Sequence, residues 1–376
     1  MVKVKIDNLL LSPKDIKPSS NKFEVLGVLN PAAIRLKDGK ILLYIRVIEK
    51  LKKTEDAKYF YVPRFVGKDK FKVGIDRFPK SKVVDKDKIS IIFKNDIKRL
   101  TFISHFRKIF LDKTGLKIEK IEKKPSFFGC KGESELGVED PRITKIDGMY
   151  YMTYVGLSRR EGISTYLASS KDGLKWERKG IIFGEQDKDV VLFPEKVKSS
   201  YVAFDRPEGN FEFSTPHIWI AYSPDLIHWG KLKAVQLSSK HKDFLRSGAG
   251  PPPIKTDRGW LQIFHVVTKV KPRGFWINIK KIFRQEIKLG PDLYSIWVAL
   301  LDKNNPSKLI AMSHFPIIIP KKKYEISFED KKVVFPTGII KDGKFVLIYS
   351  GAGDIHISVK KIKLSEIMNS LEKKEV

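Results

Sequence analysis

One phrase recurs five times along this chain and constrains the fold more than any other feature. Each copy has a proline, a few residues, a polar turn that is often Asp-Gly, and then a run of aliphatic and aromatic residues. The copies begin at Pro31, Pro141, Pro194, Pro253 and Pro336. Asp-Gly between hydrophobic runs is a strong β-hairpin signal, because glycine readily takes the positive φ of tight hairpin turns. Recurrence of one hairpin at intervals of about 50 residues or more indicates radial repetition. The copies therefore predict an all-β fold, a five-bladed β-propeller.

The residues beside these hairpins predict a polar site. The innermost strands of a propeller converge on its axis, so residues at equivalent strand ends meet there. Before the prolines stand Asn30, Glu139-Asp140 and Phe193. Near the ends of the second strands stand Arg46, Tyr154, Arg206, His265 and Tyr349. These side chains either form one polar pocket or are strand-end residues that satisfy one another.

Length and cysteine content favour one closed unit in a reducing compartment. The chain has 376 residues and the repeats extend from position 31 to about 355, so we expect a single domain over 1–376. The one cysteine, Cys130, excludes internal disulfides. The first residues lack the apolar core of a signal peptide, and no apolar stretch approaches the roughly 18 residues of a membrane span. We expect a cytoplasmic protein with no transmembrane segment.

The net charge of +29 has three interpretations. It could attract nucleic acid, it could suit an anionic substrate such as phosphate, or it could be a lysine-rich surface of the thermophile kind. The lysines are dispersed, and no RNP, KH or helix-turn-helix pattern is present. We interpret the charge as surface character and expect no specific nucleic-acid partner.

Two segments interrupt the repeat. Gly39 and Gly148 are 109 residues apart, about twice one blade, which predicts an insertion within 48–132. Its piece at 100–111 (LTFISHFRKIFL) has the pattern of a basic amphipathic helix, and 268–290 is similarly basic and aromatic. Either segment could contact a membrane surface or a polyanion, or form a loop or a subunit contact. A homo-oligomer is left open.

Two further patterns concern packing. The segments SSKDGLKW and YSPDLIHW end in Trp176 and Trp229, which are predicted to pack between blades. At the C-terminus, hydrophobic residues with helical spacing follow a serine cap and predict a short closing helix. They are Leu364, Ile367, Met368 and Leu371.

Most catalytic signatures are absent from the sequence. It has no HExxH, CxxC or EF-hand pattern, no P-loop or Rossmann fingerprint, and no GxSxG elbow. We therefore predict no metal and no organic cofactor. What remains is acid catalysis by a carboxylate beside basic residues.

Several motifs, in order, resemble those of glycoside hydrolase family 130. They are NPAA (30–33), GVEDPR (137–142), KDVVLFPEK (188–196), YSPDLIHW (222–229), GAGPPPIKT (248–256), LLD (300–302), FPTG (335–338) and GAGD (351–354). The resemblance covers about 25–360, excluding most of 48–132. It implies a five-bladed propeller and, for most members, an inverting phosphorylase. Such an enzyme splits β-mannosides with inorganic phosphate to give α-mannose 1-phosphate. A minority are β-1,2-mannosidases.

The resemblance also implies residue roles. Asp140 matches the general acid, thought to act through the 3-hydroxyl of the sugar. Three cations match phosphate-binding positions, where guanidinium forks and lysine charges suit phosphate: Lys188, Arg206 and Lys255. Five residues match or lie beside sugar-binding positions: Asn30, Arg46, Asp354, His265 and Tyr294. No metal is implied, and inorganic phosphate is the co-substrate of a β-mannoside oligosaccharide.

Two departures keep alternatives open. Position 188 is Lys where many members have Arg, and Asp205 stands where His is frequent. An inverting β-mannosidase of the same fold is one alternative, and it needs a carboxylate to activate water. Glu195 and Glu208 are the candidates. A non-catalytic basic propeller that binds polyanions or membrane surfaces is the other. We expect the phosphorylase.

Overall fold

The computed structural model describes residues 2–87, 89–94, 97–208, 214–235, 237, 243–270 and 290–373. Nearly all of its regular structure is β-strand. Among the described residues, no helix has the length and hydrophobicity needed to span a bilayer. The predicted segment 268–290 lies mostly outside this description, since 271–289 are not part of it.

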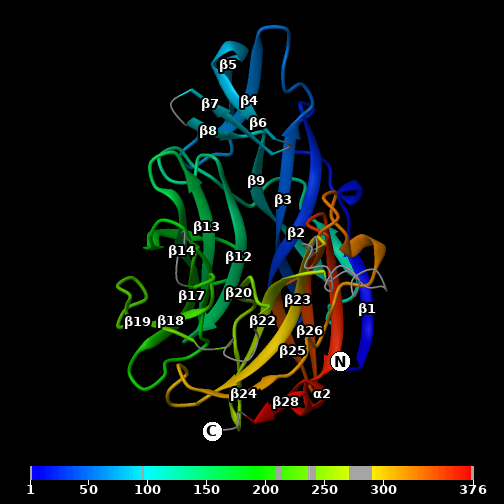
Figure 1. Cartoon of the computed structure of the whole chain (residues 1–376), viewed down its shortest axis with the longest axis vertical. Helices are drawn as coiled ribbons and strands as arrows, with labels where there is room; N and C mark the ends of the chain where they lie inside the picture. Colours follow the sequence, from blue (N-terminus) through cyan, green and yellow to red (C-terminus); the bar gives the residue numbers. More distant parts are fainter. Residues whose placement is uncertain are drawn as a thin grey trace, which may run out of the picture.

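Within the described chain the main strands form five four-stranded blades, which confirms the predicted propeller (Figure 1). The first blade has β2 (Phe23–Arg35), β3 (Ile41–Leu51), β9 (Phe102–Leu111) and β10 (Ile118–Ile121), with β11 (Phe127–Phe128) beside β9. The second has β12 (Gly137–Ile146), β13 (Met149–Ser158), β14 (Gly162–Ser170) and β15 (Glu177–Phe183). The third has β16 (Asp187–Leu192), β17 (Tyr201–Pro207), β18 (Trp219–Ser223) and β19 (Gly230–Ala234).

The fourth blade comes from one continuous part of the chain, whereas the fifth combines strands from both ends of the chain. The fourth has a broken inner strand, β20 (Arg246–Ala249) and β21 (Ile254–Thr256), then β22 (Gly259–Lys269), β23 (Asp292–Leu301) and β24 (Leu309–Ser313). The fifth has β25 (Lys332–Asp342), β26 (Phe345–Ala352), β27 (His356–Lys363) and, from the N-terminus, β1 (Val4–Leu11). The pairing of β1 with β27 therefore joins the two ends of the chain in one blade.

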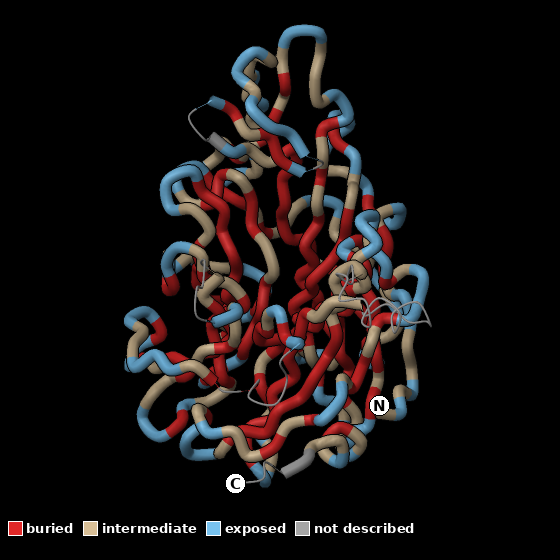
Figure 2. The backbone as a smooth tube through the Cα atoms, viewed as in Figure 1, coloured by how far each residue is buried: buried red, intermediate tan, exposed pale blue. Residues whose placement is uncertain are grey.

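Hydrophobic clusters between the blades show that the ring is closed. One cluster joins the first and second blades through Tyr44 and Met152, and others join the second to the third and the third to the fourth. Further clusters join the fourth blade to the fifth and, through Leu43 and Leu347, the fifth back to the first. Buried residues accordingly run along the strands of every blade (Figure 2). Burying apolar strand faces against neighbouring blades is the main favourable term that holds such a ring together.

The tryptophans of the outer segments pack as predicted. Trp176 of the second blade meets Tyr44 of the first edge-to-face at 5.8 Å. Trp229 of the third blade lies 5.4 Å from Phe183 of the second. Both rings therefore fill space between blades.

The prediction of a helix at 100–111 is wrong. This segment is mainly β9, which pairs with β3 over its whole length. Nearly every β9 residue is buried, so the strand shows no alternation of polar and apolar residues. A strand buried on both faces cannot be distinguished from a buried helix by periodicity. His105 and Arg107 lie 3.3 Å and 3.0 Å from the buried Glu49 carboxylate there.

The residues between β3 and β9 form a lobe at one end of the ring (Figure 1). It contains a hairpin and a three-stranded sheet: β4 (Tyr59–Phe65), β5 (Val73–Pro79), β6 (Val83–Lys86), β7 (Ser90–Phe93) and β8 (Ile97–Leu100). Short 3-10 turns occur at Pro13–Asp15, Lys80–Lys82 and Lys323–Glu325. The lobe rests on the first blade through a cluster that includes Phe65 and Ile103.

The C-terminal helix is present but shorter than the hydrophobic pattern. Helix α2 (Leu364–Asn369) begins after Lys363, so Ser365 lies inside it and is not its cap. Leu371 belongs to β28 (Leu371–Lys373), which pairs with β24.

Candidate active site

The innermost strands of the first three blades break at the same level. Bulges interrupt the pairing of β2, β12 and β16 at Asn30, Asp140 and Asp189. These residues have φ of 47°, 50° and 55°. Asn and Asp are the non-glycine residues most often found in this left-handed region, and bulges redirect side chains beside active sites. Backbone strain at three equivalent positions around one axis indicates a functional site.

One group of side chains, here called the acid corner, consists of Asn30, Arg46, Glu139, Asp140 and Asp354. Asp140 Oδ1 accepts hydrogen bonds from Asn30 Nδ2 at 2.8 Å and from Arg46 Nη1 at 3.1 Å. Arg46 Nη2 also pairs with Glu139. Both bonds to Asp140 use one oxygen, which leaves Oδ2 as the oxygen that a substrate hydroxyl can reach.

The electrostatics of the acid corner favour a charged Arg46 and a protonated Asp354. Burial tends to lower the pKa of Arg46, but the charges of Glu139 and Asp140 outweigh it and the pKa is raised. The Asp354 residue remains exposed at the surface, although protein surrounds its carboxyl group. Burial raises its pKa, Arg46 opposes the rise, and the charge of Asp140 adds to it.

A second group, the cation corner, consists of Lys188, Arg206, Arg246 and the carboxylate they share, Glu208. Arg206 Nη1 and Arg246 Nη1 each lie 3.0 Å from Glu208 Oε1, and Lys188 Nζ lies 3.7 Å from Oε2. Lys188 and Arg206 are directly paired residues of β16 and β17. The Lys188 and Arg246 side chains remain 27% and 32% exposed, so an anion can reach them. Three cations around one carboxylate leave an excess of positive charge.

Asp189 and Arg142 connect the two corners. Asp189 is buried, and its two oxygens accept bonds from Arg142 Nη2 and Arg206 Nε, each at 2.8 Å. Arg142 Nη1 in turn donates to the backbone carbonyl of Asp140 at 3.3 Å. Although burial acts against ionisation, Arg206 and Arg142 hold the pKa of Asp189 well below its usual range. The path Asp140–Arg142–Asp189–Arg206 thus makes the corners one hydrogen-bonded unit.

His265 and Tyr294 complete the fourth-blade side. His265 Nε2 lies 3.6 Å from Asp189 Oδ2, and burial lowers the histidine pKa to about 3, so the ring is neutral. Tyr294 stacks on His265 at 6.3 Å and its hydroxyl accepts a 2.5 Å bond from Arg246 Nη2. Gly248 allows this close packing, because a Cβ there would overlap both Asp189 and His265.

The structure brings together most of the residues that the sequence analysis singled out. The acid corner holds Asn30, Arg46, Asp140 and Asp354, and the fourth-blade side holds His265 and Tyr294. Lys188 and Arg206 lie in the cation corner.

Lys255 is not brought to this site. It lies on β21 opposite Trp260, whereas Gly248 lies opposite His265. Five residues along β22 correspond to roughly 16 Å at about 3.3 Å per residue. Lys255 pairs there with Glu195, and both side chains are more than 40% exposed. Arg246, which the motif comparison missed, is the third cation of the cluster.

Phe193, Tyr154 and Tyr349 also lie elsewhere. Phe193 packs against Trp260 at 5.0 Å, Tyr154 bonds Glu133, and Tyr349 bonds the carbonyl of Gly115. The residue equivalent to Asn30 and Asp140 in the third blade is Asp189.

The turns, rather than the prolines, carry the signal that identifies Asp189. Asn30 and Asp140 stand nine and eight residues before the turn glycines Gly39 and Gly148. Asp189 stands nine before Lys198, the left-handed residue of its own turn. Aligning the repeats on their turns therefore identifies Asp189, whereas aligning them on their prolines selects the residue before Pro194.

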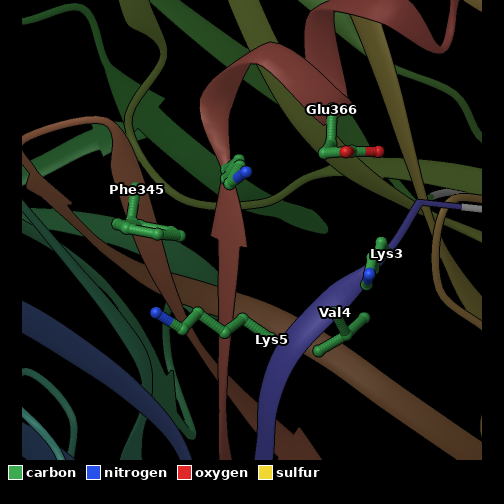
Figure 3. Close-up of a pocket in the computed structure, with 6 residues that line it drawn as sticks. Lys3, Val4, Lys5, Phe345 and Glu366 are labelled. Atoms are coloured by element: carbon green, nitrogen blue, oxygen red, sulfur yellow. The ribbon is translucent and has the colours of Figure 1, made fainter.

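Two other features were considered as sites. Among the described residues, no group of three or more His, Cys, Asp or Glu side chains is arranged to hold a metal ion. A surface hollow of about 370 Å³ lies where β26 begins, at the opposite end of that strand from the acid corner (Figure 3). Its lining includes Lys3, Lys5, Phe345 and Glu366. It shares no residue with either corner.

Comparison with known proteins gives consistent results. The sequence profile of glycoside hydrolase family 130, described as beta-1,4-mannooligosaccharide phosphorylase, matches residues 112–373. A beta-1,2-mannobiose phosphorylase of Listeria innocua is 30% identical over 375 residues, 97% of each chain. A 1,2-beta-oligomannan phosphorylase of a Thermoanaerobacter strain is 33% identical over 68% of this chain and 78% of its own.

A solved structure agrees with these sequence matches. The Listeria innocua phosphorylase in complex with beta-1,2-mannobiose superposes with a TM-score of 0.79 over 96% of each chain, at 29% identity. The similarity thus extends over the lobe and over β2, β3 and β9 of the first blade, which precede the residues that the family profile matches.

Proposed function

The chain belongs to glycoside hydrolase family 130, and on this premise we propose that its axial site is that of an inverting β-mannoside phosphorylase. The enzyme would cleave a β-mannoside with inorganic phosphate and release α-mannose 1-phosphate and the shortened acceptor. The names of two relatives, a beta-1,2-mannobiose phosphorylase and a 1,2-beta-oligomannan phosphorylase, support a β-1,2 linkage for the substrate.

The observation that carries the proposal is the separation of the two corners. Asp140 is held at one end by Asn30 and Arg46, while three cations lie at the other end beyond Arg142 and Asp189. An inverting phosphorolysis needs an acid at the leaving oxygen and an anion on the opposite face of the sugar. The protein need supply no base, because phosphate is itself the nucleophile.

The residues of each corner then have distinct roles. A phosphate oxygen attacks the anomeric carbon while the bond from that carbon to the acceptor oxygen breaks. The proton for that oxygen comes from Asp140, and the resemblance to the family implies that it passes through the 3-hydroxyl of the mannose. Lys188, Arg206 and Arg246 bind the phosphate, with Arg246 in the place that the motif comparison gave to Lys255. Asn30, Arg46 and Asp354 bind the mannose hydroxyls, and neutral His265 and Tyr294 border the phosphate.

The hydrolase alternative is less well supported. An inverting mannosidase needs a free carboxylate to activate water. Glu208 is the candidate nearest the cations, but Lys188, Arg206 and Arg246 all engage it. Glu195 pairs with Lys255 away from the axis.

Product analysis tests the proposal. The protein is incubated with β-1,2-mannobiose and, separately, β-1,4-mannobiose, each with and without inorganic phosphate, and the sugars are identified by chromatography. We expect mannose 1-phosphate and mannose from the β-1,2 substrate only when phosphate is present. Release of two mannoses without phosphate would instead establish hydrolysis, and turnover of only the β-1,4 substrate would overturn the linkage.

A further inference from the structure

Two buried carboxyl groups lie directly behind the cation corner and take no part in the reaction described above. Asp187 begins β16 and Asp205 lies near the end of β17, with exposures of 8% and 1%. Lys188 and Arg206 are paired across the same two strands, and side chains alternate along a strand. Asp187 and Asp205 therefore share the opposite face from the cations, the face toward the second blade.

The two carboxyl groups contact each other. Asp187 is the hydrogen-bonding neighbour of the Asp205 side chain, and among the described residues no N–H or O–H donor reaches either Asp205 oxygen. An ionised carboxylate without a donor at this depth is costly, and two carboxylates in contact cannot both ionise readily. One proton shared by the pair satisfies both conditions, with one carboxyl donating to the other.

The pair is attached to the backbone of a phosphate-binding residue. Asp187 Oδ1 accepts the backbone N–H of Arg206 at 3.2 Å, while Asp189 holds the Arg206 side chain at Nε. The Asp187 carbonyl accepts Thr165 Oγ1 of β14 at 2.9 Å, which ties this strand end to the second blade. Arg206 is thus fixed at both its backbone and its guanidinium.

The surroundings of the two carboxyl groups place the loss of the shared proton near neutral pH. Burial and the charge of Asp187 raise the pKa of Asp205 to about 8, and burial raises that of Asp187 to about 7. Of the charged groups around Asp187, Arg206 favours ionisation and Asp189 opposes it. The other elements packed there present uncharged groups, Thr165 from β14 and Trp219 opposite Asp205 on β18.

We propose that Asp187 and Asp205 are a positioning pair for the phosphate site. One shared proton keeps the two carboxyl groups together and so holds the Arg206 backbone in place. Loss of that proton weakens phosphate binding. Losing the proton puts two repelling negative charges behind Arg206 and releases the contact that fixes its backbone. The inference rests on the proposed function, because it concerns the affinity of the same cations for phosphate.

The test compares wild type with Asp205→Asn, whose amide donates to Asp187 at every pH and so imitates the protonated pair. Asp225→Asn is the matched control, since Asp225 is an exposed turn residue of the same blade. The dissociation constant of inorganic phosphate is measured by titration calorimetry from pH 6 to 8.5. The ionisation of phosphate itself affects all three proteins equally.

We expect the dissociation constant of wild type and Asp225→Asn to rise over this range about tenfold more than that of Asp205→Asn, as an interaction worth about one pKa unit would give. The maximal rate at saturating phosphate should change less than the KM for phosphate. Without phosphate, the Tm of wild type should fall relative to Asp205→Asn as pH rises through 7 to 8. The folded protein binds the shared proton more tightly than the unfolded chain, so that stabilisation declines as pH rises above the unfolded carboxyl pKa and is fully lost once pH passes about 8.

Parallel pH profiles of phosphate affinity for wild type and Asp205→Asn would overturn the inference while leaving the phosphorylase intact. A Tm difference without a difference in phosphate affinity would also overturn it, by reducing the pair to a structural role. Absence of phosphate binding by wild type at every pH would reject the proposed function and the inference together. Asp187→Asn, whose amide oxygen can accept the Arg206 N–H, serves the same test if Asp205→Asn does not fold.

Discussion

The acid corner and the cation corner are built from similar strands but have opposite charge. In the acid corner one arginine, Arg46, lies near the carboxyl groups of Glu139, Asp140 and Asp354. Asp140 accepts both of its hydrogen bonds on one oxygen. In the cation corner three cations share Glu208. An excess of carboxyls favours holding a proton, whereas an excess of cations favours binding an anion. Under the proposed function, one propeller axis therefore provides both requirements of phosphorolysis, with Arg142 and Asp189 between them.

The largest expected effect is on the acid corner. Asp140→Asn keeps the size of the side chain but removes its transferable proton. General acid catalysis is typically worth about 10²–10⁴-fold, so the initial rate of mannose 1-phosphate formation should fall at least about a hundredfold with unchanged Tm. Asp147→Asn is the matched control, because Asp147 is an exposed left-handed residue of the same hairpin. Near-normal activity of Asp140→Asn would remove the acid corner from the chemistry.

The cation corner is tested by two basic residues of one inner strand. Arg246→Ala should raise the KM for phosphate about tenfold or more, because a hydrogen bond to a charged group is worth about 1.5–3 kcal/mol. Lys255→Ala should leave that KM within about twofold, since Lys255 pairs with Glu195 instead. Steady-state kinetics with varied phosphate measures both. A larger rise in KM for Lys255→Ala than for Arg246→Ala would support the motif-based assignment of Lys255 and contradict the assignment of Arg246 to the phosphate site.

Substitution of Glu208 distinguishes a role beside bound phosphate from a role in activating water. Glu208→Gln removes one negative charge among three cations, so the KM for phosphate should fall about two- to threefold while kcat stays within about tenfold. Kinetics in phosphate-containing and phosphate-free buffer check this. A variant that loses all activity, together with a wild type that needs no phosphate, would identify Glu208 as a hydrolytic base.

The smallest expected effect concerns His265, which lies between the corners. Its folded pKa of about 3 is below the usual 6.5, so the unfolded chain binds a proton that the folded protein does not. Stability should therefore fall as pH falls from about 6.5 toward 4, by about 1–3 kcal/mol from this group. Chemical denaturation at several pH values should show a shallower slope for His265→Gln than for wild type or His228→Gln, whose ring is exposed. Equal slopes would contradict a neutral, buried His265.

The sequence predicted the propeller because the hairpin turns repeat locally, and local turn chemistry is readable without tertiary structure. It predicted Asn30 and Asp140 because a proline follows each of them. In the third and fourth blades the prolines lie at other positions along the inner strand. For this reason Phe193, which precedes Pro194, was selected instead of Asp189. Lys255 was selected instead of Arg246 because its motif resembles a phosphate-binding motif of the family, and the motif does not show that Lys255 lies on β21 away from the axial site.

Other features depend on contacts that sequence spacing does not encode. Strand β9 resembles a helix because both of its faces are buried between neighbouring blades and strands. The contact of Asp187 with Asp205 depends on the register of β16 and β17, which a bulge at Asp189 sets. Neither the bulge nor the register is visible before the strands are paired.

A crystal structure of Asp140→Asn with β-1,2-mannobiose and phosphate tests the division of the site most directly. We predict phosphate density in contact with Lys188, Arg206 and Arg246, and a mannose whose hydroxyls contact Asn30, Arg46 and the substituted residue at 140. The anomeric carbon should lie between the phosphate and the leaving oxygen. Phosphate bound beside Lys255, or a sugar that lies in the cation corner with no phosphate near it, would contradict the account.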